Sequence, residues 1–203
     1  SGAKASGDEG IFGRDDIDPT KLPIPFQFTV DAAPYITAGQ ITARDPETGV
    51  DTTGFHRLML KGKNRLGVSL HSRRRMYEYH RRAEAKGQSL PAAIVIGVHP
   101  LHYMGSMVYA YPPHVRKYEI IGGLFGEPYR LARRGCAGIA APASAAASID
   151  GELPAGGHAP RGPLGGSDSD GHSHGPTRVL GAPRARACAP ERSPTRRAPP
   201  GSR

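Results

Sequence analysis

Hydrophobic and polar residues alternate in short stretches in the first third of the chain, which indicates β-strands rather than helices. In the first stretch, Ile41 and Ala43 fall on one face. Turns are predicted at residues 45–49, with Pro46 at the second position, and at residues 61–64. The predicted strands are residues 39–44, 55–60 and 66–70. We therefore expect an antiparallel meander that either closes into a small barrel or packs one face on a helix.

After residue 72, apolar residues recur every three or four positions instead of every second one. Met76, Tyr79 and Ala83 share one face of a predicted helix over residues 73–86, and Gly87 ends it. Further elements are predicted downstream: a buried strand at 92–97, a helix after a loop within 99–109, a helix at 115–125 and a strand at 127–132. Together these elements predict an α+β domain.

The composition changes near residue 133, where large apolar residues give way to Ala, Gly, Pro, Ser and Arg. The whole chain has 203 residues, of which 27 are glycine and 20 are proline. A segment of this composition buries too little apolar surface to offset its ordering entropy. We expect a flexible N-terminal segment (1–20), a globular core (21–134) and a low-complexity or degenerate tail (135–203). A truncation, a frameshift or a degenerate copy would each produce such a tail.

The net charge of +9 comes largely from this tail, and a basic tail suggests nucleic acid or a membrane surface. No aromatic residues interleave with its arginines, so we expect a solvated tail and no nucleic-acid partner. The chain lacks an apolar run of roughly 20 residues, so no membrane span is expected. Cys136 and Cys188 form no CxxC pair, which favours a cytoplasmic protein without a zinc site of that kind. Residues 168–174 mix Asp and His and suggest at most weak metal binding.

Seven basic residues gather on or beside the predicted meander: Arg57, Lys61, Lys63, Arg65, Arg73, Arg74 and Arg75. A phosphate-bearing ligand would suit them, because arginine offers a bidentate fork and turn amides add donors. The alternative is a solvated helix face beside a charged turn. From these residues alone, both interpretations stay open.

Several short motifs follow one another in a fixed order: residues 31–39, 43–49, 56–57, 61–64, 84–87, 90–97 and 122–128. In this order and spacing, the chain resembles the UbiD family of reversible decarboxylases over about 110 residues. Weaker matches to the family's next motifs occur at residues 142–145, 152–154 and 162–163.

This resemblance implies a split antiparallel β-barrel, related to flavin reductases, with flanking helices. It implies prenylated FMN as cofactor, supplied by a separate flavin prenyltransferase, with Mn²⁺ and K⁺ at its phosphate. The substrate would be an aromatic or α,β-unsaturated carboxylic acid, and the full-length protein a homo-oligomer. The cofactor would carry the carbon chemistry, and the protein would supply positioning and electrostatics.

Site residues follow from the resemblance position by position. Arg57 matches the catalytic arginine above the flavin and the substrate carboxylate. The family's metal-binding asparagine matches Thr52, and its metal-binding glutamate matches Lys117 or, with a shifted alignment, Glu119. The expected cofactor-binding residues are Thr52, Gly54, Phe55, His56, Arg57, Ser69, Leu70, His71, Arg74, Arg75, Ser106, Met107 and Lys117.

Several of these positions depart from the family pattern. The family's metal-binding asparagine and glutamate fall on Thr52 and Lys117, and a position that is histidine in many members falls on Arg75. The family's two proton-transfer acids fall on Arg161 and Gly166. In one interpretation, the cations replace the metal as the counter-charge of the phosphate; in the other, the site has decayed. The alternative function is a non-catalytic subunit that binds a flavin or a nucleotide phosphate. A basic module whose tail contacts nucleic acid is the third hypothesis.

Overall fold

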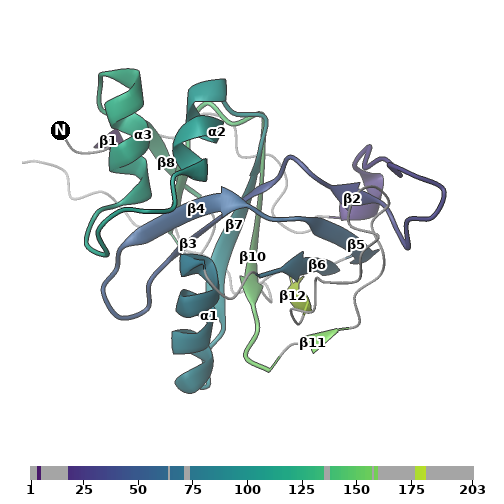
Figure 1. Cartoon of the computed structure of the whole chain (residues 1–203). Coiled ribbons are helices and arrows are strands. Elements are labelled where there is room, and N and C mark those ends of the chain that lie inside the picture. Colours follow the sequence, from purple (N-terminus) through teal and green to yellow (C-terminus); the bar gives the residue numbers. More distant parts are fainter. Residues whose placement is uncertain are drawn as a thin grey trace, which may run out of the picture.

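The computed structural model describes residues 4–5, 18–63, 65–70, 74–134, 138–156, 158–159 and 177–181. Within them, two sheets and three α-helices form a mixed α/β fold (Figure 1). The helices are α1 (Arg75–Ala85), α2 (Pro100–Met107) and α3 (Lys117–Phe125), and a 3-10 turn spans Pro19–Lys21. None of the helices in these ranges is long and apolar enough to cross a bilayer.

The larger sheet is antiparallel throughout, and its strands follow the order β2-β5-β6-β12-β10-β7-β3-β4, with β11 paired to β12. Its strands are β2 (Tyr35–Ile36), β3 (Gln40–Arg44), β4 (Asp51–Phe55), β5 (Leu58–Gly62), β6 (Arg65–Ser69), β7 (Leu90–Ile96), β10 (Ala147–Leu153), β11 (His158–Ala159) and β12 (Thr177–Gly181). In the smaller sheet, β8 (Arg130–Arg134) lies between β1 (Lys4–Ala5) and β9 (Ile139–Pro142).

The predicted strand 55–60 is wrong as a single strand. The chain forms β4 up to Phe55 and β5 from Leu58, with His56 and Arg57 between them. The hairpins β3–β4 and β5–β6 exist, but β4 and β5 are not neighbours in the sheet, so the expected three-strand meander is also wrong. Phe55 and Leu58 are three positions apart and can lie at most roughly 10 Å from each other, so the sheet must curve to bring the end of β4 close to the start of β5.

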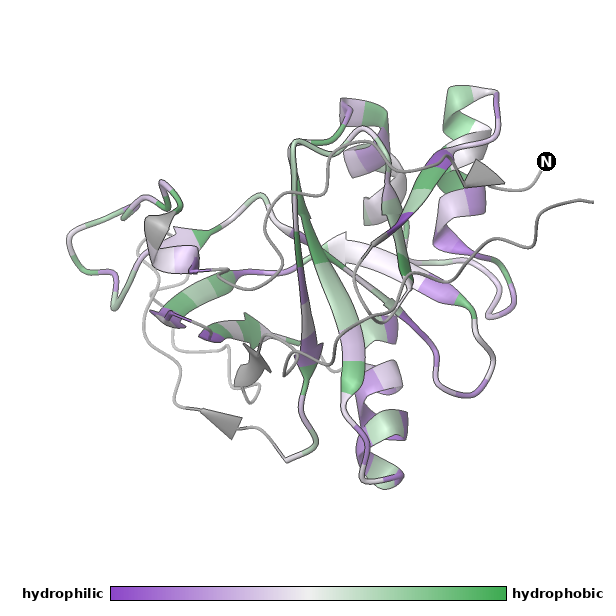
Figure 2. Ribbon diagram, turned by 180° about the vertical axis from the view of Figure 1, so that it is seen from behind, coloured by the Kyte–Doolittle hydropathy of each residue, from purple (hydrophilic) through white to green (hydrophobic). Residues whose placement is uncertain are grey.

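The main core lies between α1 and the larger sheet. Met76, Tyr79 and Ala83 pack there against Ile41 and Ala43, which confirms the predicted faces of the helix and the first strand. Hydrophobic residues follow the central strands, whereas α1 carries hydrophilic and hydrophobic residues in turn (Figure 2). Burying an apolar face against a sheet is the main source of stability for a helix of this length.

The helices α2 and α3 pack against each other and against β4, and lie on the opposite side of β4 from α1 (Figure 1). Gly105 allows this approach, because a Cβ there would lie 2.7 Å from Ile121 Cγ1. The polar side of β3 therefore becomes buried as well: Gln40 is 0% and Thr42 1% exposed. Alternation along β3 had not indicated this second buried face.

Part of the predicted tail is folded. Ala147–Leu153 pairs with β7 over seven residues, and Ile149 and Leu153 enter the main core. The strands β9 and β10 consist mostly of small residues, and the average composition of the tail therefore predicted no structure there. Small residues nevertheless pack well between neighbouring strands. Other predictions for the tail concern residues outside the described ranges: Cys136, Arg161, Gly166, residues 168–174 and Cys188.

Candidate functional site

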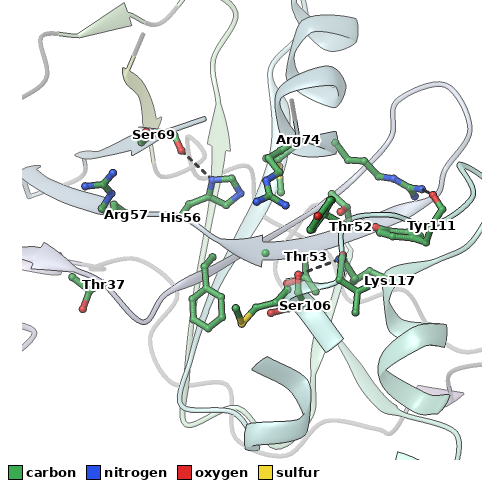
Figure 3. A pocket seen from close by; sticks show the side chains of 17 residues that line it. Thr37, Thr52, Thr53, His56, Arg57, Ser69, Arg74, Ser106, Tyr111 and Lys117 are labelled. Atoms are coloured by element: carbon green, nitrogen blue, oxygen red, sulfur yellow. Dashed lines mark hydrogen bonds between the residues drawn. The ribbon is translucent and has the colours of Figure 1, made fainter. Parts of the chain in front are cut away.

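A cavity of about 470 Å³ opens where the end of β4 passes into β5 (Figure 3). The end of β6, the first turn of α1, the end of α2 and the start of α3 complete its wall. Eleven of the thirteen expected cofactor-binding residues line it: Thr52, Gly54, Phe55, His56, Arg57, Ser69, Arg74, Arg75, Ser106, Met107 and Lys117. The tertiary structure thus gathers residues that span 66 positions of the sequence.

Three expected site residues lie elsewhere or cannot be placed. Leu70 packs in the main core with 2% exposure and does not line the cavity. Glu119 accepts a hydrogen bond from the Arg116 backbone N–H at 3.2 Å, which caps the start of α3 away from the cavity wall. His71 lies outside the described residues.

The loop after α2 supplies cavity residues that sequence reasoning missed. The Tyr111 ring lies 3.7 Å from Arg75 Cζ and 4.6 Å from Lys117 Nζ, and the Tyr109 ring lies 5.1 Å from Arg74 Cζ. Such cation–π contacts stabilise cations close to one another in a partly desolvated site. Tyr109 at the end of one predicted helical segment and Tyr111 just beyond it offered only a weak sequence signal. Thr37, Thr53, Met76 and Val108 complete the wall.

Arg57 and Lys117 lie at opposite ends of the cavity, with His56 and Arg74 between them (Figure 3). Arg57 is half-buried, and its carbonyl accepts from the Ser69 backbone N–H at 3.3 Å, which ties the β4–β5 connection to β6. A ligand that reaches both ends would contact a guanidinium at one end and a buried ammonium at the other.

Lys117 is only 3% exposed although it carries a charge. Its Nζ donates to the carbonyl of Ser106 at 3.0 Å and to that of Val108. Burial, followed by the charges of Arg75 and Arg74, lowers the pKa of Lys117 to about 8, so the ammonium still predominates at pH 7. The chain therefore keeps a positive charge inside this end of the cavity.

His56 forms the floor of the cavity beside Gly54. Its Nδ1 donates to the Ser69 carbonyl at 3.0 Å, because a carbonyl oxygen can only accept. Burial, with a smaller contribution from Arg74, lowers the pKa of His56 although the Ser69 contact opposes this shift. His56 is thus neutral at pH 7 with Nε2 unprotonated, and this nitrogen lies 4.0 Å from where a Cβ of Gly54 would be.

A buried polar network supports the wall behind Ser106. The Tyr129 hydroxyl donates to His102 Nδ1 at 2.9 Å, and His102 Nε2 donates to Gln40 Oε1 at 2.6 Å. The amide of Gln40 then donates to Ser106 Oγ at 2.8 Å, and this hydroxyl donates to the Tyr103 carbonyl at 2.7 Å. Each donor in this series of hydrogen bonds has an acceptor, which fixes the tautomer of His102 and the position of Ser106. Burial lowers the pKa of His102 to about 4, so it is neutral at pH 7.

The residues of the cavity fit a flavin but not a divalent metal. Its volume is typical of a small-molecule site, and Gly54 leaves open the space that a side chain would fill. Phe55, Met76 and Met107 offer apolar surface for a ring system. Among the described residues, however, no group of three or more His, Cys, Asp or Glu could hold a metal, and no carboxylate lines the cavity. Manganese prefers such oxygen ligands.

The family model described as "UbiD: 3-octaprenyl-4-hydroxybenzoate carboxy-lyase Rift-related domain" matches residues 3–179. The chain therefore belongs to the UbiD family, a family of decarboxylases, as the sequence resemblance implied.

Particular relatives agree with this membership. Anhydromevalonate phosphate decarboxylase of Methanosarcina mazei is 39% identical over 119 residues, which make up 57% of this chain and 26% of that protein. The decarboxylase of the same name from Methanothermobacter thermautotrophicus is 46% identical over 88 residues, 43% of this chain and 20% of that protein.

Solved structures share the fold. An evolved dimeric form of the UbiD-class enzyme HmfF from Pelotomaculum thermopropionicum, in complex with prFMN, has a TM-score of 0.75 and 33% identity, covering 83% of this chain and 39% of that one. The 3,4-dihydroxybenzoic acid decarboxylase AroY of Klebsiella pneumoniae has a TM-score of 0.67 and 28% identity, covering 82% and 36%. This chain thus spans between a fifth and two fifths of the length of these relatives.

Proposed function

We propose that this chain is the flavin-binding core of a UbiD-like decarboxylase that uses prenylated FMN and acts on an aromatic or α,β-unsaturated carboxylic acid. One observation carries the proposal: a single cavity holds Arg57 at one end and the buried cation Lys117 at the other. HmfF was solved with prFMN and with FMN, which supports a flavin as the ligand.

Each end of the cavity has a proposed role. The guanidinium of Arg57 would pair with the substrate carboxylate through two parallel hydrogen bonds, which only a planar cation can form. Gly54, Phe55 and His56 would lie along the flavin ring, with Lys117 nearest its phosphate. The prenylated flavin, when bound, supplies the carbon chemistry of decarboxylation. The residues of this chain would bind and orient both ligands.

A non-catalytic flavin- or nucleotide-phosphate-binding subunit is the second candidate, and one observation favours it. No carboxylic acid lines the cavity among the described residues, and the family's two acid positions fall on Arg161 and Gly166. Returning a proton to the product requires a titratable group within reach. His56 is one titratable group of the described wall, but its lowered pKa leaves it neutral at pH 7, so it offers few protons there.

Further parts of the proposal concern the fold and the partners. A split β-barrel is supported by the curved sheet, in which two residues join β4 to β5 from distant places in the strand order. A flavin prenyltransferase would supply the cofactor. The full-length protein would be a homo-oligomer in the cytoplasm, and the dimeric HmfF supports the assembly.

Co-expression with a flavin prenyltransferase tests the proposal. We expect the purified chain to carry flavin absorbance and to exchange carbon dioxide with aromatic or α,β-unsaturated acids. An Arg57→Ala variant should bind the flavin more weakly and lose exchange, whereas Arg81→Ala, on the exposed face of α1, should change neither. Bound flavin without exchange in the parent would favour the non-catalytic subunit. Colourless protein that also fails to bind added FMN would refute both candidates.

A further inference from the structure

The two positions that the family resemblance assigns to a divalent metal carry no anionic ligand here. Thr52 and Lys117 occupy them, Arg75 stands at a position that is histidine in many family members, and all three line the same end of the cavity around Tyr111 (Figure 3). The tertiary structure therefore brings the positions together but supplies one hydroxyl and two positive charges. Two positive charges at the same end of the cavity repel Mn²⁺, and no carboxylate of the described wall offsets them.

Lys117 is already held as a bound cation would be. Its Nζ contacts the carbonyl oxygens of Ser106 and Val108 and lies over the Tyr111 ring. Main-chain carbonyl oxygens are typical ligands of hard cations. An ammonium has three N–H groups, and these two carbonyls use two of them among the described residues, so one is left for a ligand. The side chain starts from the first residue of α3, which anchors it.

The neighbouring residues Arg75 and Arg74 have different roles at this end of the cavity. The guanidinium of Arg75 donates to the carbonyls of Tyr111, Pro112, Pro113 and Val115 at 2.7–3.3 Å, so it holds the loop between α2 and α3. Arg74 is exposed, lines the cavity and lies beside Tyr109. The charge of Arg75 adds to the field, whereas Arg74 can direct its fork at a ligand.

We propose that Lys117 and Arg74 act as tethered cations that bind the flavin phosphate directly, so that this site needs no dissociable metal. The inference rests on the proposed function and adds the means of phosphate recognition. A phosphate carries a charge between −1.5 and −2 at pH 7 and three acceptor oxygens, which matches an ammonium beside a guanidinium. A covalently attached counter-charge cannot be removed by a chelator.

The test is a titration of the purified chain with FMN and with riboflavin, which lacks the phosphate, at pH 7 in EDTA and in MnCl₂. Flavin fluorescence reports binding. We expect FMN to bind more tightly than riboflavin, with the same Kd in EDTA and in MnCl₂. Lys117→Met should weaken FMN binding by about 30-fold or more and leave riboflavin binding unchanged. Lys86→Met, an exposed lysine beyond α1, is the matched control and should change neither Kd.

Two results would overturn the inference alone: FMN binding that is lost in EDTA and restored by MnCl₂, or a Lys117→Met variant that keeps the preference for FMN over riboflavin. Circular dichroism shows whether Lys117→Met folds. If it does not, Arg74→Met, at an exposed position, takes its place and should reduce the same preference. Failure of both flavins to bind, with or without MnCl₂, would instead remove the proposed function and the inference with it.

Discussion

Replacing Gln40 by methionine should destabilise the fold by about 2–4 kcal/mol, although the two side chains have similar length and shape. Gln40 is 0% exposed, accepts from His102 Nε2 at 2.6 Å and donates to Ser106 Oγ at 2.8 Å. Methionine leaves the His102 N–H buried without an acceptor and removes the donor to Ser106. Each buried group without a partner costs about 1–3 kcal/mol, and the added apolar burial offsets a small part of this.

The chain contains eight tyrosines and no tryptophan, so tyrosine fluorescence and circular dichroism can follow urea and thermal unfolding. The expected loss corresponds to a Tm lower by roughly 5–12 °C for a domain of this size. Gln88→Met is the matched control, because Gln88 is exposed after α1, and its free energy of unfolding should change by less than about 0.5 kcal/mol.

A Gln40→Met variant as stable as Gln88→Met would refute the reasoning, since the network would then contribute nothing to stability. A double-mutant cycle with His102→Phe provides a further check. Because these two side chains contact each other directly, their effects should not add, and the double variant should lose less than the sum of the single losses.

The other predictions concern glycines and pH. Gly54→Val should abolish FMN binding while leaving Tm nearly unchanged, because its side chain would fill the cavity rather than the core; unchanged binding would contradict the site. Gly105→Ala should lower the free energy of unfolding in urea by about 1–3 kcal/mol, since its Cβ would meet Ile121. Gly123→Ala should raise this free energy by about 0.5–1 kcal/mol, because no atom lies close to the added Cβ and alanine favours a helix over glycine. The folded pKa of His102, about 4, lies below its unfolded value near 6.5, so the unfolded state binds more protons between these values. Stability should therefore fall as pH drops from 6.5 to 4, and by less in His102→Gln; equal pH profiles would disprove this origin.

Local patterns were sufficient to predict most secondary-structure elements. Met76, Tyr79 and Ala83 recur at helical spacing, and Ile41 and Ala43 alternate, because a helix or strand buries one face whatever its partner is. The break at His56 and Arg57 was not predicted, because both residue types are compatible with a strand. It depends on contacts with a strand far along the chain, where His56 Nδ1 donates to the Ser69 carbonyl and the Arg57 carbonyl accepts from the Ser69 N–H. The strand Ala147–Leu153 was not predicted, because the composition was averaged over the whole tail.

The sequence by itself determined the helical and strand faces, since these depend on residue type and spacing. The order and spacing of its motifs determined the family and, through that resemblance, most residues of the cavity wall. Only the tertiary structure decided how the charged residues are used. Arg74 and Arg75 are adjacent in sequence, yet the Arg75 guanidinium donates to four loop carbonyls, whereas Arg74 faces the cavity. Likewise, Lys117 became a buried cation because folding placed the carbonyls of Ser106 and Val108 around it. Hydrogen-bond partners that are far apart along the chain depend on the packing of α2 and α3, which no local pattern specifies.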